Sequence, residues 1–241
     1  MVADIPIHQE TPSQIQAEWK FVGDNNLAAI KRGIFIDKLS LSNDPKVIQN
    51  FLKMYSETQI PEIKEKLIQG TLAYYQGHRK EIKVNGDEIA LQKFYAKLLY
   101  VKLNKNESDI VLRGYVDLSP TDLILSNKKQ IDLLLEKGEV NSVLSLKLAL
   151  AMKSAELERI YIPLIIDMLK KNRNRADLDS TFFWVMKNNG YQHLRSDTSR
   201  LEVKSYLEFS KSKYSIENNS DDINFMFAKK YFEDLKTIFR N

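Results

Sequence analysis

The sequence of 241 residues contains no cysteine. This absence excludes disulfide bonds, thiol nucleophiles and thiolate metal sites together. Glycine and proline are scarce, with 8 and 6 residues respectively. Because tightly turned strands and glycine-rich phosphate-binding loops depend on such residues, their scarcity favours long helices. No apolar run approaches the roughly 20 residues that a membrane-spanning helix needs, so we predict no transmembrane segment.

The sequence motifs of the common enzyme classes are also missing. The chain contains no GxxxxGK[ST] loop, no glycine-rich dinucleotide fingerprint, no HExxH and no GxSxG. His8, His78 and His193 lie far apart and share no ligand spacing, whereas metal ligands usually occur in recognisable clusters. We therefore predict no catalytic residue, no metal and no cofactor. An enzyme that uses an acid pair outside these motifs is a weaker alternative.

Asp177 and Asp179 form a DxD pair, a pattern that binds divalent ions in nucleotide-sugar enzymes. The pair falls at the predicted start of a helix, where carboxylates interact favourably with the helix dipole. The dipole accounts for the pair without a bound ion, so we interpret it as a feature of the helix start.

The net charge bears on whether the protein binds nucleic acid, and the first residues bear on its location in the cell. Lysine and arginine outnumber aspartate and glutamate by 36 to 32, a net charge of +4, which does not by itself imply nucleic-acid binding. Residues 1–16 contain neither a basic nor an apolar segment, so the sequence predicts no signal peptide and, as written, a cytoplasmic location. The lack of cysteine also suits an exported protein. A periplasmic or secreted location, with the leader missing from the sequence, is therefore the alternative.

Residues typical of helix starts and joints recur along the chain. Pro61, Asn106 and Ser154 each stand where a helix is expected to begin. Between such residues, apolar side chains recur at helical spacing. The sequence therefore predicts a succession of helices with short polar joints. The pair Asn85 and Gly86 predicts a turn, with a small strand hairpin as one form of it.

The predicted helices pair into hairpins of roughly 30 to 45 residues, the period expected of α-solenoids. The stretch at 61–75, PEIKEKLIQGTLAYY, resembles the second helix of a HEAT-type repeat, with a proline start and a stripe of small and apolar residues. The stretch at 157–172, LERIYIPLIIDMLKKN, resembles the first helix of such a repeat, including Pro163 at a position where these helices often kink. The resemblance implies an all-α fold, an irregular α-solenoid of HEAT-like helical hairpins, with an irregular helical bundle as the alternative.

This fold leads to a prediction of domains and function. We expect a single helical-repeat domain over 1–241, with an N-terminal segment at 1–22, helical hairpins at 23–190 and C-terminal helices at 191–241. Because stacked hairpins present an extended surface, we predict a non-enzymatic protein–protein interaction module or a component of a larger assembly, with a protein as its partner. A nucleic-acid-binding HEAT-like protein or base-excision enzyme is the alternative, since basic HEAT-like DNA glycosylases exist.

Basic and aromatic residues are the candidates for the interaction surface. The run at 170–175 places four positive charges at a helix end and in the following joint, where cations favour the helix dipole or contact phosphates. Phe182, Phe183 and Trp184 are consecutive, so at about 100° per residue they cannot all face one core. We expect Phe183 to be buried and Trp184 to turn aside, where a rigid ring makes a good anchor. The residues we predict for the interaction surface are Tyr75, Trp184, Tyr191, Lys171, Arg173 and Arg175.

Overall fold

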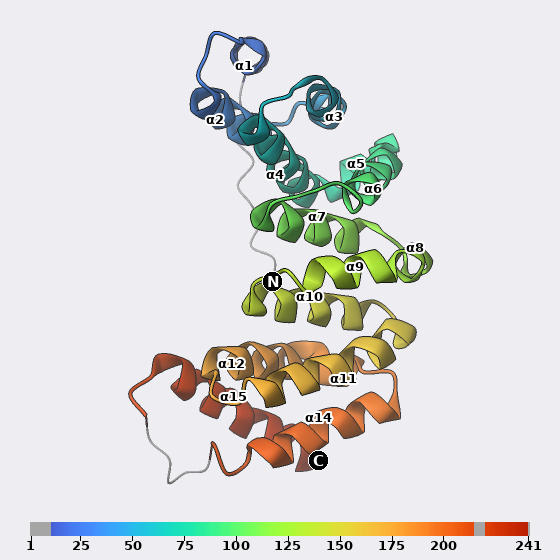
Figure 1. The fold of residues 1–241 in the computed structure, drawn as a ribbon, viewed down its shortest axis with the longest axis vertical. Helices are drawn as coiled ribbons and strands as arrows, with labels where there is room; N and C mark the ends of the chain where they lie inside the picture. Colours follow the sequence, from blue (N-terminus) through green and yellow to red (C-terminus); the bar gives the residue numbers. More distant parts are fainter. Residues whose placement is uncertain (1–10, 215–219, 241) are drawn as a thin grey trace. The chain divides into compact units, whose positions relative to one another are not determined.

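The computed structural model describes residues 11–214 and 220–240 (Figure 1). These residues form helices and no strand, which confirms the all-α prediction. By their internal contacts they divide into two compact units, residues 1–119 (unit 1) and 120–241 (unit 2). The prediction of a single repeat domain with inner boundaries after residues 22 and 190 stays a prediction.

Unit 1 is organised around its longest helix, α4, which packs against α2, α3 and α7. Helices α1 and α2 pack on each other, as do α6 and α7. In chain order the helices are α1 (Pro12–Gly23), α2 (Ala29–Leu39), α3 (Val47–Glu57), α4 (Pro61–Gly77), α5 (Arg79–Asn85), α6 (Asp87–Leu98) and α7 (Lys105–Leu118).

Two glycines let the helices of unit 1 approach closely. A Cβ on Gly114 in α7 would lie 2.6 Å from the ring of Tyr95 in α6, and one on Gly70 in α4 would lie 2.8 Å from the ring of Phe51 in α3. The buried hydroxyl of Tyr95 is also satisfied, because it lies 3.0 Å from the Thr71 hydroxyl of α4. Close packing at the two glycines therefore fixes the contacts of α6 with α7 and of α3 with α4, and the Tyr95 hydrogen bond fixes α6 against α4.

Local sequence signals set most helix boundaries in unit 1. Pro61 is the first residue of α4, as expected. Helix α7 begins two residues earlier than the sequence indicated, because Asn104, not Asn106, accepts a hydrogen bond from the backbone of Glu107 and forms a capping box with it. The predicted turn at Gly86 exists, with φ of 78°. It joins helices α5 and α6, so the strand hairpin considered there is wrong.

Unit 2 contains the longest helical hairpin, formed by α10 and α11, which are separated by Ser154 alone. The Ser154 side chain accepts a hydrogen bond from the backbone N–H of Leu157, which confirms its predicted capping role. Helix α11 also packs on α14, and α12 packs on α15 (Figure 1). The elements are α8 (Thr121–Ser126), α9 (Lys128–Leu135), α10 (Val140–Lys153), α11 (Ala155–Lys171), α12 (Ala176–Val185), the π-helical turn η1 (Met186–Gly190), α13 (Tyr191–His193), α14 (Asp197–Ser210) and α15 (Ile223–Arg240).

The core of unit 2 is a cluster of buried aromatic rings. Phe183 of α12 lies at its centre, with its ring centroid 5.7 to 6.0 Å from those of Tyr206, Tyr214 and Phe232. Edge-to-face and tilted ring pairs at such distances add to the stability gained from burial. The cluster ties α12 to α14 and α15, and it holds the end of α12 in a fixed orientation.

Candidate functional site

The six residues predicted for the interaction surface fall in both units. Tyr75 is in unit 1 and the other five are in unit 2. The Tyr75 ring is only 7% exposed and has the Arg79 guanidinium 5.3 Å from its centroid. Burial raises the pKa of its phenol. Tyr75 therefore offers little surface to a partner.

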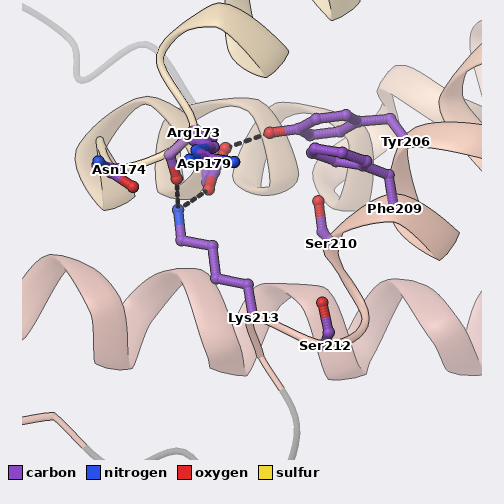
Figure 2. A pocket seen from close by; sticks show the side chains of 8 residues that line it. All are labelled: Arg173, Asn174, Asp179, Tyr206, Phe209, Ser210, Ser212 and Lys213. Atoms are coloured by element: carbon purple, nitrogen blue, oxygen red, sulfur yellow. Dashed lines mark hydrogen bonds and ion pairs between the residues drawn. The ribbon is translucent and has the colours of Figure 1, made fainter.

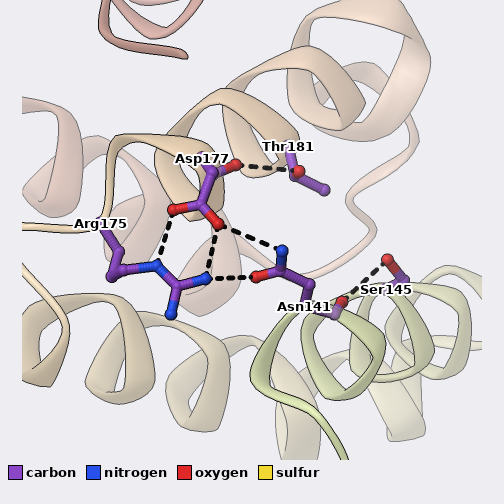
Figure 3. A network of polar contacts seen from close by, with 5 residues as sticks. All are labelled: Asn141, Ser145, Arg175, Asp177 and Thr181. Atoms are coloured by element: carbon purple, nitrogen blue, oxygen red, sulfur yellow. Dashed lines mark hydrogen bonds and ion pairs between the residues drawn. The ribbon is translucent and has the colours of Figure 1, made fainter. Parts of the chain in front are cut away.

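Arg175 links two helices of unit 2 through hydrogen bonds (Figure 3). Its Nε lies 2.8 Å from Oδ1 of Asp177 and its Nη2 lies 2.6 Å from Oδ2, so the guanidinium binds the carboxylate through two hydrogen bonds. The same Nη2 donates to Oδ1 of Asn141 in α10 at 3.0 Å, and the Asn141 amide donates back to Asp177. Hydrogen bonding from Arg175 lowers the pKa of Asp177 to about 2. The network connects the start of α12 to α10.

The other two basic residues predicted for the surface, Lys171 and Arg173, differ in their carboxylate partners. Lys171 forms an exposed ion pair with Asp167, one helical turn away, at 2.7 Å. Arg173 is exposed in the joint before α12 and has no carboxylate partner among the described residues. Because acids accompany Lys171 and Arg175, the run at 170–175 presents less free positive charge than its sequence indicated.

Trp184 is half exposed, at 50%, on the last turn of α12. Tyr191 follows seven residues later and is partly exposed. Between them lies the π-helical turn η1. Such turns are rare and occur often at functional sites. The two predicted aromatic residues therefore flank the π-helical turn η1.

Helix α12 and the turn η1, which carry Trp184 and Lys187, pack against α15. Lys187, one turn further on, forms an ion pair with Asp234 at 2.5 Å and places its Nζ 5.4 Å from the centroid of Tyr231. The Tyr231 ring stacks on Phe227, with centroids 6.1 Å apart. We call Trp184, Lys187, Met226, Phe227 and Tyr231 the α12–α15 surface. It brings together segments that are distant in the chain, since 47 positions separate Lys187 from its ion-pair partner Asp234.

A half-open cavity of about 350 Å³ lies where the joint before α12 meets the end of α14 (Figure 2). Its lining combines charged, hydroxyl and aromatic side chains. The lining residues are Arg173, Asn174, Asp179, Tyr206, Phe209, Ser210, Ser212 and Lys213.

Asp179 forms the polar centre of this cavity, although it is almost fully buried. Its Oδ1 accepts a hydrogen bond from the Tyr206 hydroxyl, and its Oδ2 accepts from the Tyr214 hydroxyl, both at 2.5 Å. The Lys213 ammonium lies 2.6 Å from the same Oδ2. Burial, followed by the charge of Asp179, raises the pKa of both phenols. The carboxylate is thus held by two neutral donors and one cation, an arrangement that suits a fixed anchor better than a proton-transfer group.

Sequence reasoning singled out Asp179 only as part of a DxD pair, and it did not select Phe209 at all. The structure separates the two acids, since Asp177 binds Arg175 and Asp179 binds Lys213. Both acids lie in the first turn of α12, as the dipole interpretation expected. The pairing of Asp179 with Lys213 crosses 34 positions, so no local pattern could have indicated it.

Comparisons with known proteins give no relative. No protein-family model, no curated protein and no solved structure matches this chain. Within residues 11–214 and 220–240, no cluster of histidine, aspartate and glutamate side chains is suited to a metal ion. None of the helices in the same ranges combines the length and apolar character needed to cross a bilayer.

Proposed function

We propose that this chain is a non-enzymatic protein-interaction module, and that its α12–α15 surface binds a partner protein. We also propose that its hairpins are HEAT-like repeats of an α-solenoid. Adjacent helices that pack as antiparallel pairs support the second proposal, above all α10 with α11. The α12–α15 surface supports the proposal that the chain binds a partner protein.

The observation that carries the binding proposal is the exposure of large apolar side chains on the α12–α15 surface. Trp184 is 50% exposed, Met226 54% and Phe227 43%. Single exposed apolar residues are ordinary, but these three lie on two helices that pack against each other, and larger exposed apolar surfaces mark interaction sites. Tryptophan and other aromatic residues also supply a large share of the energy at protein interfaces.

The α12–α15 surface is held in place before any partner binds. The ion pair between Lys187 and Asp234 joins η1 to α15, and the stacked rings of Tyr231 and Phe227 fix one turn of α15. Beneath them, buried Phe183 contacts Phe232. Ordering side chains on binding costs free energy, so a preorganised surface binds more tightly than a mobile one.

The partner that fits this surface has an apolar patch with a polar border. The charged residues at this surface, Lys187 and Asp234, already pair with each other. A nucleic acid would need several unpaired cations along one face, and Lys171 and Arg175 are paired with Asp167 and Asp177. A protein is therefore the better match.

The experiment compares partner capture by three tagged full-length proteins from a lysate of the source organism. The first is the unchanged protein, the second carries Trp184→Ala with Phe227→Ala, and the third carries Phe209→Ala. Phe209 is a matched control because it is an aromatic residue of unit 2 with 51% exposure and lies outside the α12–α15 surface.

We expect at least one protein to be captured by the unchanged chain and by the Phe209 variant, and to be lost with the double variant. Loss of two anchors weakens binding on the order of 100-fold or more. Capture of the same proteins by all three would show that the α12–α15 surface is not the binding site. Circular dichroism of each variant excludes unfolding as the cause of any loss.

A further inference from the structure

The cavity beside Asp179 has the size of a small-molecule site. Its volume of about 350 Å³ lies near the lower end of the roughly 300 to 1,000 Å³ found for ligand pockets. It lies at the ends of α11 and α14 and the start of α12, whereas the α12–α15 surface lies at the opposite end of α12. The cavity and the proposed protein-binding surface are therefore separate features.

The buried charge of the cavity is balanced within the protein. We call Asp179 and its three hydrogen-bond donors the cavity floor. Asp179 accepts hydrogen bonds from Tyr206, Tyr214 and Lys213. Lys213 also donates to the backbone carbonyl of Arg173 at 2.6 Å, which joins the floor to the rim. Because Lys213 offsets the negative charge of Asp179, the floor does not repel an anion as an unpaired carboxylate would.

The rim of the cavity, formed at the joint before α12 by Arg173, carries a positive charge that no described carboxylate offsets. Arg173 lines the cavity and has no carboxylate partner among the described residues. Lys170 does not line the cavity, but its Nζ lies 5.9 Å from the centroid of the Phe209 ring, which does. A guanidinium presents planar pairs of donors that match the oxygens of a phosphate or carboxylate. The rim thus favours an anionic group.

Phe209 gives the cavity an aromatic wall. Its ring stacks on Tyr206 with centroids 5.9 Å apart and an interplanar angle of 24°, and half of its surface stays exposed. Figure 2 shows the two rings side by side, with Arg173 and Asp179 at the hydroxyl end of Tyr206. A planar ligand would extend this stack while its anionic group meets Arg173.

We propose that this cavity binds a small organic oxyanion with a planar body, held by Arg173 at its anionic group and by Phe209 at its ring. The proposal concerns a second site of unit 2 and does not depend on the partner proposed above. A phosphate ester and a carboxylate share the required chemistry, and the test distinguishes them.

The test is a heteronuclear NMR titration of the full-length protein at low salt with phenyl phosphate, benzoate, phenol and inorganic phosphate. We expect saturable shifts at the cavity residues with phenyl phosphate or benzoate, and the tighter of the two identifies the anionic group. Phenol lacks the charge and inorganic phosphate lacks the ring, so each should bind at least about 10-fold more weakly, in line with the strength of charged hydrogen bonds. Equal binding by phenol or by inorganic phosphate would overturn the proposal, as would no saturable binding of either organic anion.

Three variants locate the site. Arg173→Gln should raise the dissociation constant about 10-fold or more, and Phe209→Ala should raise it several-fold. Lys171→Gln is the matched control, because it removes a nearby exposed cation that pairs with Asp167, and it should leave binding unchanged. An Arg173 variant that binds as well as the unchanged protein would contradict the assignment. Partner capture by the Arg173 variant reports separately on the α12–α15 surface.

Discussion

The ammonium of Lys213 lies 2.6 Å from the buried carboxylate of Asp179, although 34 positions separate the two residues. Asp179 also accepts hydrogen bonds from Tyr206 and Tyr214. One carboxylate therefore connects α12 to the end of α14 and to the residues that follow it. Three donors share the Asp179 carboxylate. Removing the carboxylate therefore leaves three groups without this acceptor, whereas removing one donor leaves the other two hydrogen bonds in place.

This asymmetry gives the first prediction. Asp179→Asn should lower the free energy of unfolding by about 3 kcal/mol, because two phenols and one ammonium lose the charged acceptor that they share. Lys213→Met should cost less, about 1 kcal/mol, because the two phenols still satisfy the carboxylate. Urea unfolding followed by tyrosine and tryptophan fluorescence measures both. Equal losses would show that the phenols do not hold Asp179.

Glu158 leads to the second prediction. This buried carboxylate of α11 accepts hydrogen bonds from the backbone N–H groups of Arg195 and Ser196, at 2.8 and 2.9 Å, just before α14 begins. Glu158→Gln replaces one acceptor oxygen with a donor, so we expect a loss of about 1 to 3 kcal/mol, the cost of an unpaired buried donor. Glu156→Gln, an exposed change in the first turn of the same helix, should cost at most about 0.5 kcal/mol through the helix dipole. A neutral Glu158 variant in the same urea unfolding series would refute this role.

The third prediction concerns the close helix contact in unit 1. Gly114→Ala would place a Cβ 2.6 Å from the Tyr95 ring, and such overpacking typically costs about 1 to 3 kcal/mol. Gly77→Ala is the matched control, because nothing lies within 4 Å of its added Cβ. We expect the first variant to melt at a lower temperature and the second to melt at or above the original one. The reverse order would mean that α6 and α7 do not pack as described.

The fourth prediction concerns pH. The pKa of Asp177 falls from 3.8 to about 2, chiefly because Arg175 donates hydrogen bonds to it. A folded-state pKa below the unfolded value adds stability above pH 4, and that contribution is lost as the pH falls toward 2. Asp177→Asn lacks the contribution at every pH. The stability difference between the two proteins, from urea unfolding at a series of pH values, should therefore shrink between pH 4 and 2. A constant difference would show that Arg175 does not stabilise the charged carboxylate.

The helices could be predicted from the sequence because their boundaries depend on local residues. Pro61 and Ser154 act on the turn that follows them, and apolar spacing shows which face is buried. The burial of Phe183 and the exposure of Trp184 likewise follow from consecutive rings on one helix. The asparagine that begins α7 was misplaced by two residues, because several polar residues there are suitable caps.

The sites were harder to predict, since they depend on residues far apart in the chain. Lys187 reaches Phe227 through Tyr231, and no local pattern encodes that path. Arg175 is different, because an acid two residues later is a visible sign that the arginine is already paired.

The most direct test of the proposed function is site-specific photo-cross-linking at position 184 in cells of the source organism. A photoreactive phenylalanine analogue replaces Trp184, and the same analogue at Phe209 serves as control. Because Trp184 is half exposed, this change should cost about 1 kcal/mol of stability or less. We predict a discrete protein adduct from position 184 that is absent from position 209. Equal adducts from both positions, or none from 184, would contradict the account.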